Sequence, residues 1–139
     1  MSIAIDYPSY SDARGNFKEL LDAAAAGRTV TVARDGQLAA VLPVERLREH
    51  LVAVLPARVR VFAEDGRVIA LMEDHPFVAE GASVDDAVAD LIEALREYAQ
   101  DWDDRLKSAP NHHDAWAFVQ LVKLSTDEQL RTWFEDGQD

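Results

Sequence analysis

The sequence of 139 residues contains no cysteine, which excludes disulfide bonds and metal sites built from thiolates. It also lacks an apolar run long enough to cross a bilayer. The N-terminal segment MSIAIDYPSY has neither the basic stretch nor the apolar core of a signal peptide. These absences together predict a cytoplasmic protein without a membrane partner.

Basic residues are scarce, with 14 lysines and arginines against 26 aspartates and glutamates and a net charge of −12. Such an acidic surface argues at first against a nucleic-acid partner. The excess of acidic residues is unevenly distributed along the chain. Residues 1–55 hold 6 basic and 7 acidic side chains, whereas residues 56–139 hold 8 basic and 19 acidic ones. The net charges of −1 and −11 that follow predict two partners, one anionic and one basic.

A strand and a helix are predicted at the start of the chain. Residues 3–7 alternate between apolar and polar side chains, as a half-buried strand does. Ser11 is a suitable N-cap, and apolar side chains recur at helical spacing up to Ala26, before Gly27 ends the helix. Arg14 would then lie in the first turn, where a cation opposes the helix dipole. A bound anion would explain this position, and so would an ion pair with a neighbouring carboxylate.

A β-hairpin and a second helix follow. Asp35-Gly36 favours a two-residue hairpin turn, because both positions of such a turn require positive φ. Arg34 lies at the tip, where it either projects toward a ligand or is simply solvated. Apolar spacing predicts a helix over residues 44–55. We therefore place a first domain at residues 1–55.

The sequence of the second region, residues 56–139, predicts a further hairpin followed by helices. Asp65-Gly66 is its turn signal. Ser83 caps a helix of about 20 residues with a narrow apolar seam. Asn111 is expected to cap another helix, and Ser125 a last one that ends near residue 136. The tryptophans are expected in the core, with anchoring of a partner as the alternative: Trp102, Trp116 and Trp133.

The motifs of residues 3–55 resemble, in order and spacing, the N-terminal part of the Phd/YefM antitoxins of bacterial toxin–antitoxin pairs. That family shows an Ala-Arg pair at a helix start, a leucine-bearing helix ending near glycine, and a hairpin with an Arg-x-Gly tip. The matching segments here are Ser11-Asp12-Ala13-Arg14, Leu20-Leu21 with Gly27, Val30-Thr31-Val32, Arg34-Asp35-Gly36 and Ala40-Val41-Leu42.

The resemblance implies a homodimer that binds a palindromic operator in its own promoter, with Arg14 and Arg34 touching the DNA. Ser11, Asn16 and Lys18 are expected to support these contacts. Dimerisation also has a physical reason, since about 55 residues bury too little surface to be comfortably stable alone. The expected fold class is α+β, with a small Phd/YefM-like βαββα dimerisation module followed by a β-hairpin and a helix-rich C-terminal region.

Residues 60–102 resemble the HicB type of antitoxin fold. The match rests on the hairpin, on the turn Glu80-Gly81-Ala82-Ser83 and on the helix start Asp85-Asp86-Ala87. Phd/YefM antitoxins usually end in a short flexible toxin-binding tail, and this chain departs from that pattern. We expect the acidic region to bind and neutralise a basic, RNA-targeting toxin, although a charged helix face is often only solvated.

An enzyme, a cofactor or a metal site is not expected. His112 and His113 are adjacent in the sequence, so they do not share a helix face, and they form no ligand motif with His75. The sequence has no Gly-rich phosphate loop. A hydrolase resembling RNase H would need several convergent carboxylates. The alternative that stays open is a dimeric interaction or inhibitor module that does not bind DNA.

Overall fold

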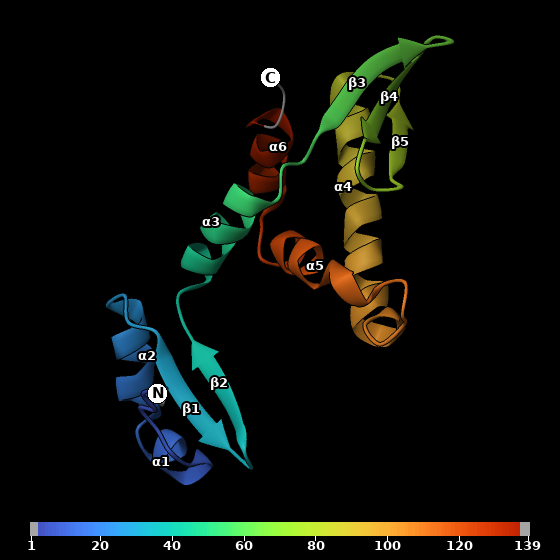
Figure 1. The fold of residues 1–139 in the computed structure, drawn as a ribbon. Helices are drawn as coiled ribbons and strands as arrows, with labels where there is room; N and C mark the ends of the chain where they lie inside the picture. Colours follow the sequence, from blue (N-terminus) through green and yellow to red (C-terminus); the bar gives the residue numbers. More distant parts are fainter. Residues whose placement is uncertain (1–2, 137–139) are drawn as a thin grey trace. The chain divides into compact units, whose positions relative to one another are not determined.

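The structure, a computed structural model, describes residues 3–136 apart from the side chain of His113. These residues form six α-helices, one two-stranded sheet and one three-stranded sheet, a mixed α and β architecture (Figure 1). The chain divides into two compact units, Met1–Leu47 and Arg48–Asp139. None of the helices in the described range is both long enough and apolar enough to cross a membrane.

The division between the units lies inside α3 (Val44–Val54), whereas the sequence places the end of the first domain at residue 55. The end of α3 is held within the second unit, because the Trp133 indole donates a 2.7 Å hydrogen bond to the Leu55 carbonyl. Leu51 in the same half of the helix is buried. The binding roles assigned to residues 1–55 and 56–139 stay predictions.

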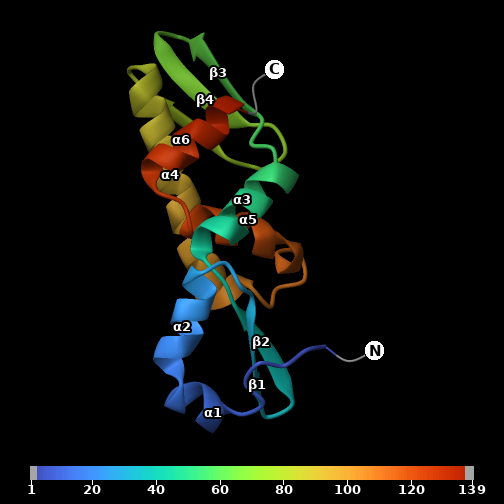
Figure 2. The same ribbon diagram turned by 90° about the vertical axis from the view of Figure 1, so that its left-hand side faces the viewer.

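In the first unit two short helices lie against a β-hairpin (Figures 1 and 2). Asp35 and Gly36 have φ values of 50° and 80°, which confirms the predicted turn. The strand predicted at residues 3–7 is wrong, because the structure has only one parallel bridge there, between Tyr7 and Val32. The elements are α1 (Tyr10–Gly15), α2 (Phe17–Ala25), β1 (Val30–Arg34) and β2 (Gln37–Val41).

The single long helix predicted for the first unit is interrupted at Asn16. Ser9, and not Ser11, is the N-cap, since the Ser9 hydroxyl accepts a 3.1 Å hydrogen bond from the backbone N–H of Asp12. The Asn16 side-chain amide donates to the Asp12 carbonyl at 2.9 Å. Asparagine competes with helical hydrogen bonding in this way, which accounts for the end of α1 and the start of α2 at this residue.

The second unit is built on an antiparallel sheet in the order β3-β4-β5, with α4 packed on it. The predicted turn at Asp65-Gly66 is confirmed by φ values of 51° and 78°. The predicted cap is confirmed as well, because the backbone N–H of Asp86 donates to the Ser83 hydroxyl at 3.1 Å. The elements are β3 (Val59–Glu64), β4 (Arg67–Met72), β5 (Val78–Gly81) and α4 (Val84–Asp101).

The apolar seam of α4 forms the core of the second unit together with the sheet and the last two helices, α5 (Trp116–Lys123) and α6 (Asp127–Asp136). The α4 helix continues into a π-helical turn, Trp102–Leu106. Trp102 and Trp133 are buried as predicted, but Trp116 is 50% exposed, so its assignment to the core is wrong. The largest fully buried side chains here are Met72, Leu91, Leu95, Leu121 and Leu130.

Two helix starts in the second unit differ from the prediction. Asn111 does not cap α5, which begins after a short 3-10 turn, His113–Ala115. Ser125 does not cap α6, because its buried hydroxyl donates to the Leu121 carbonyl at 2.7 Å. Thr126 takes that role instead, since its hydroxyl accepts from the backbone N–H of Gln129 at 3.1 Å. The capping box is therefore one residue further along the chain.

Candidate functional site

Arg14 lies in the last turn of α1, not in the first turn of a long helix. A cation is favourable near the C-terminal end of a helix. The argument that Arg14 opposes the helix dipole and therefore needs a bound anion is wrong for this structure. The side chain is nevertheless exposed, so it is accessible to a partner.

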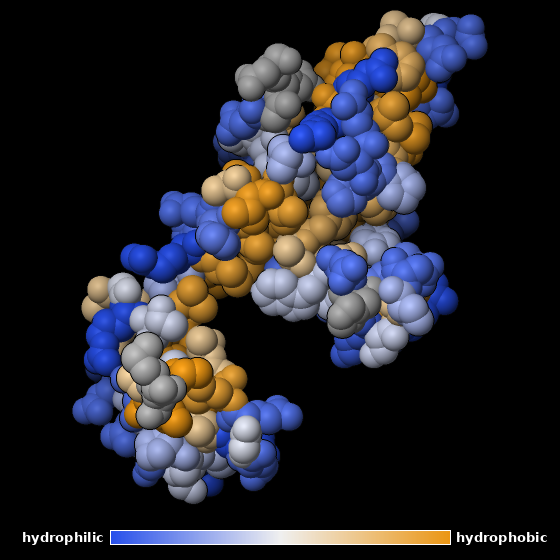
Figure 3. Space-filling model, in the orientation of Figure 1, coloured by the Kyte–Doolittle hydropathy of each residue, from blue (hydrophilic) through white to orange (hydrophobic). Residues whose placement is uncertain are grey.

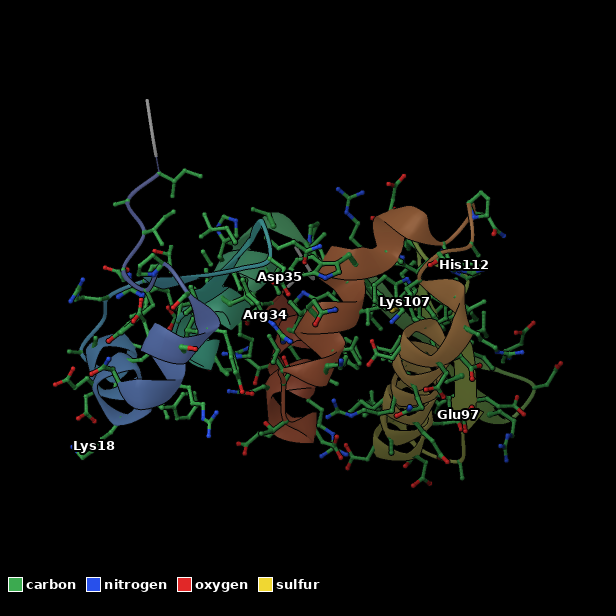
Figure 4. All side chains as sticks on the ribbon, turned by 90° about the horizontal axis from the view of Figure 1, so that it is seen from below. Lys18, Arg34, Asp35, Glu97, Lys107 and His112 are labelled. Carbon is green, nitrogen blue, oxygen red and sulfur yellow. The ribbon has the colours of Figure 1, made fainter. Side chains whose placement is uncertain are left out.

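Arg34 ends β1 at the tip of the hairpin, and its side chain lies against Tyr10. The guanidinium carbon is 5.0 Å from the centroid of the Tyr10 ring, within the range of a cation–π interaction. Its Nε atom lies 3.6 Å from a carboxylate oxygen of Asp35 (Figure 4). The side chain is still 69% exposed. Arg34 is therefore oriented by its neighbours without being buried.

Tyr10 lines two surface depressions, one beside each arginine. A depression of about 380 Å³ is lined by Tyr10, Arg14 and Phe17 together with Val32. A second depression of about 470 Å³ is lined by Tyr10 and Val32 again, here with Arg34. Because the two depressions share Tyr10 and Val32, the arginines border neighbouring depressions around Tyr10.

The three supporting residues are only partly gathered there. Ser11 is exposed on α1, and the Asn16 amide is used in its hydrogen bond to the backbone. Lys18 forms an exposed ion pair with Asp22 at 2.9 Å. Figure 4 shows Lys18 and Arg34 well separated within the first unit. The structure thus brings Arg14 and Arg34 to neighbouring depressions and leaves Lys18 apart from Arg34.

Tyr10 lines both depressions beside the candidate arginines, and the sequence patterns above do not single it out. It precedes Arg14 by four residues, and residues at this spacing share one face of a helix. The four-residue spacing of Tyr10 and Arg14 indicates a shared face only if the helix includes Tyr10. The predicted helix begins after Ser11, because serine is a preferred N-cap, and it leaves Tyr10 outside.

Apolar side chains reach the surface of the first unit around the same helices. Its core is small, consisting of Ala13, Leu20, Ala24 and Val30. In Figure 3, hydrophobic side chains are visible among the hydrophilic ones on this unit. The exposed large apolar residues of α1, α2 and β2 are Tyr10, Phe17, Leu21 and Leu38. A unit of this size leaves apolar surface without an intramolecular partner.

Two histidines of the second unit, His75 and His112, belong to an aromatic cluster that the sequence does not predict. His75 stacks on Phe118 with 4.3 Å between ring centroids, and His112 hydrogen-bonds through Nδ1 to the Tyr98 hydroxyl at 2.9 Å. The side chain of His113 lies outside the described residues. Within the described part of the chain no three His, Asp or Glu side chains are grouped so that they could hold a metal ion.

Comparison with known proteins gives a family match over most of the chain. Residues 5–132 match the family described as "Antitoxin of toxin-antitoxin, RelE / RelB, TA system". None of the curated proteins matches the sequence.

The fold is also similar to a crystal structure from Syntrophomonas wolfei subsp. wolfei, described as an antitoxin part of a proposed toxin/antitoxin system. The match has a TM-score of 0.74 and 22% sequence identity, and it covers 93% of this chain and 96% of that one. Identity at this level supports the fold. Proteins of the matched family are regulatory and not enzymes. The match over residues 5–132 therefore shows that this chain belongs to the family of toxin–antitoxin antitoxins, which implies a toxin as its partner.

Proposed function

We propose that this chain is the antitoxin of a type II toxin–antitoxin system in the cytoplasm. It neutralises its toxin by direct binding and represses its own operon as a DNA-bound homodimer. The first unit dimerises and contacts operator DNA through Arg14 and Arg34, with Ser11, Asn16 and Lys18 in support. The second unit binds the toxin.

The proposal that Arg14 and Arg34 contact DNA is supported by the surface around Tyr10. Arg14 and Arg34 come from a helix and from a hairpin tip, yet both border depressions lined by this one ring. Two exposed arginines on one surface can contact neighbouring phosphates or base edges. In a two-fold dimer the pair becomes four contacts, which suits a symmetric operator.

The exposed apolar side chains of the first unit support the dimer. Phe17 is 57% exposed and Leu21 46% exposed on α2. The unit has a core of only four buried residues among those described. A second copy would cover this apolar surface and add buried area.

The charge of the second unit supports a basic toxin. Residues 48–139 hold 9 lysines and arginines and 20 aspartates and glutamates, a net charge of −11. The negative electrostatic field of such a surface attracts a cationic partner and speeds its association. Toxins that act on RNA carry such positive surfaces, so an RNA-targeting toxin is the proposed partner.

A gel-shift assay with DNA from upstream of the gene tests the repressor assignment. Replacing Arg14 and Arg34 together by alanine is expected to weaken operator binding by about 1–3 kcal/mol for each arginine that reads a base. Arg131→Ala removes one equivalent charge from an exposed position on α6 and is the control. Unchanged affinity in the double variant would show that these arginines do not contact the operator.

One observation favours the alternative, a dimeric interaction or inhibitor module that does not bind DNA. The first unit is not basic, since residues 1–47 hold 5 basic and 6 acidic side chains, and Arg34 already contacts Tyr10 and Asp35. In that case the wild-type protein would bind its upstream DNA no better than unrelated DNA, while still binding the toxin.

A further inference from the structure

The second unit contains a pocket of about 510 Å³, within the range of about 300–1,000 Å³ typical of ligand sites. Its walls come from segments that are distant in the sequence. These are Leu55, the β4–β5 connection with His75 and Phe77, the helix α4 with Tyr98, and the stretch that leads into α5, with Asn111, His112, Asp114 and Phe118.

Aromatic rings form one side of the pocket. His75 stacks on Phe118 at 4.3 Å, and Phe77 lies parallel to Phe118 at 5.8 Å with 13° between the ring planes. Tyr98 contacts Phe77 edge-on at 5.4 Å. Phe118 is buried beneath His75, so the rings accessible to a ligand are the partly exposed ones of His75, Phe77 and Tyr98. A planar cation stacks favourably on the face of an aromatic ring.

Other lining residues of the pocket are polar, and His112 among them is held in place. The Trp102 indole donates to the His112 carbonyl at 2.9 Å, and the His112 ring is hydrogen-bonded to the Tyr98 hydroxyl. Asn111 and Asp114 also line the pocket. Because two hydrogen bonds hold His112, this residue loses little freedom when a ligand binds.

The charge of this wall is negative. Asp114 is exposed and forms no ion pair with any residue that the structure describes. Burial lowers the pKa of His75, although the neighbouring Asp74 opposes that shift, and a lowered pKa favours the neutral imidazole. Burial also raises the pKa of the Tyr98 phenol, which therefore stays uncharged. The pocket offers a carboxylate beside neutral aromatic rings.

We propose that this pocket receives an arginine side chain of the toxin, with the guanidinium stacked on the aromatic wall and hydrogen-bonded to Asp114. This inference rests on the proposed function, because the occupant comes from the toxin. Arginine fits better than lysine, since its planar and weakly hydrated head both stacks and makes paired hydrogen bonds to a carboxylate. The net charge of −11 on residues 48–139 is complementary to such a partner. Arginine is also enriched among the residues that dominate binding at interfaces.

A first experiment uses the antitoxin alone. Capped arginine amide is titrated into the full chain, and the ring signals of His75, His112 and Phe118 are followed by NMR. Capped leucine amide and capped glutamate amide serve as comparison ligands. We expect saturable binding of the arginine compound at millimolar concentration, and loss of that binding in Asp114→Asn. Equal or stronger binding of the leucine compound would overturn the cationic assignment.

A second experiment measures toxin binding kinetics with Asp114→Asn and with Glu93→Gln. Glu93 is exposed on α4 and outside the pocket lining, so its replacement removes the same charge from the same unit. A local contact governs dissociation, whereas the general field governs association. We expect Asp114→Asn to raise the dissociation rate about tenfold and Glu93→Gln to leave it unchanged. Equal effects of the two variants would overturn the proposal.

The two experiments separate this inference from the proposed function. A chain that binds toxin but not the capped arginine contradicts the pocket assignment alone. A chain that binds the capped arginine but no toxin contradicts the proposed function, and with it the source of the occupant. Binding of both, with the expected effect of Asp114→Asn on each, supports the proposal.

Discussion

Gly81 ends β5 at the point where the chain turns toward α4, and it is buried. An added Cβ would lie 2.5 Å from the backbone nitrogen of Ala87 and 2.7 Å from the carbonyl carbon of Asp86. Backbone atoms of a packed helix cannot move aside without disturbing the packing around them. Gly81→Ala is therefore expected to lower the free energy of unfolding by about 1–3 kcal/mol, measured by urea denaturation with tryptophan fluorescence.

Gly15→Ala is the control for that substitution. Gly15 is exposed in α1, and a Cβ there would meet no atom within 4 Å among the described residues. Alanine is favoured over glycine in a helix by roughly 0.5–1 kcal/mol, so stability should be equal or higher. A similar decrease in both variants would mean that the close approach at Gly81 is not the cause.

Asp6 carries a pH-dependent part of the stability of the first unit. Its carboxylate accepts a 2.9 Å hydrogen bond from the backbone N–H of Thr31, and that bond is the main reason why its pKa is lowered from 3.8. Smaller contributions in the same direction come from the Thr31 hydroxyl and from Arg28, while burial opposes the shift.

The sign of the effect follows from linkage. A carboxyl group with a lowered folded-state pKa stabilises fully above its unfolded pKa, here near 3.8, and this stability is lost as the pH falls through the folded value. Asp6→Asn should remove that dependence below about pH 4, followed by NMR signals of β1. A carboxyl carbon of Asp6 that titrates at or above 3.8 would contradict the assignment.

At the scale of elements, a substitution at the start of α6 tests which residue caps this helix. The Thr126 hydroxyl accepts from Gln129 N–H at 3.1 Å, and the Gln129 side chain accepts from Thr126 N–H at 2.9 Å. Thr126→Ala is expected to destabilise the protein by about 1 kcal/mol, because it removes this cap. The measurement is the free energy of unfolding in urea.

Thr132→Ala is the matched control in the same helix. The Thr132 hydroxyl donates to the Glu128 carbonyl at 3.2 Å from an exposed position inside α6, where alanine is the better helix former. The variant should be neutral or slightly stabilising. Stability that is unchanged in Thr126→Ala, or lowered equally in both variants, would argue against the capping role.

At the scale of the whole molecule, the proposed dimer depends on the apolar surface of the first unit. Phe17 and Leu21 are both about half exposed on α2. Replacing both by serine should leave each chain folded but shift the molecular mass measured by light scattering from dimer to monomer, because the apolar area available for burial shrinks. Val78→Ser, at a position 62% exposed in the second unit, is the control. A dimeric mass in the double variant would place the interface elsewhere.

Much of the local structure follows from the sequence because its signals span only a few residues. Asp35-Gly36 and Asp65-Gly66 form the predicted hairpins, and Ser83 caps the predicted helix. Two predictions made from such local signals were wrong. Asn16 ends α1 through a side-chain hydrogen bond, and Trp116 follows a helical spacing but faces solvent. Periodicity cannot reveal which of two suitable faces finds a packing partner.

The sequence by itself determined the two hairpins, the long α4 helix, the division of charge and the choice of Arg14 and Arg34 as candidates. Only the tertiary structure decided that both arginines border the ring of Tyr10, and that His75, Tyr98 and Phe118 line one pocket. The physical reason is that turns and caps depend on neighbours in the chain, whereas these sites depend on packing between distant segments.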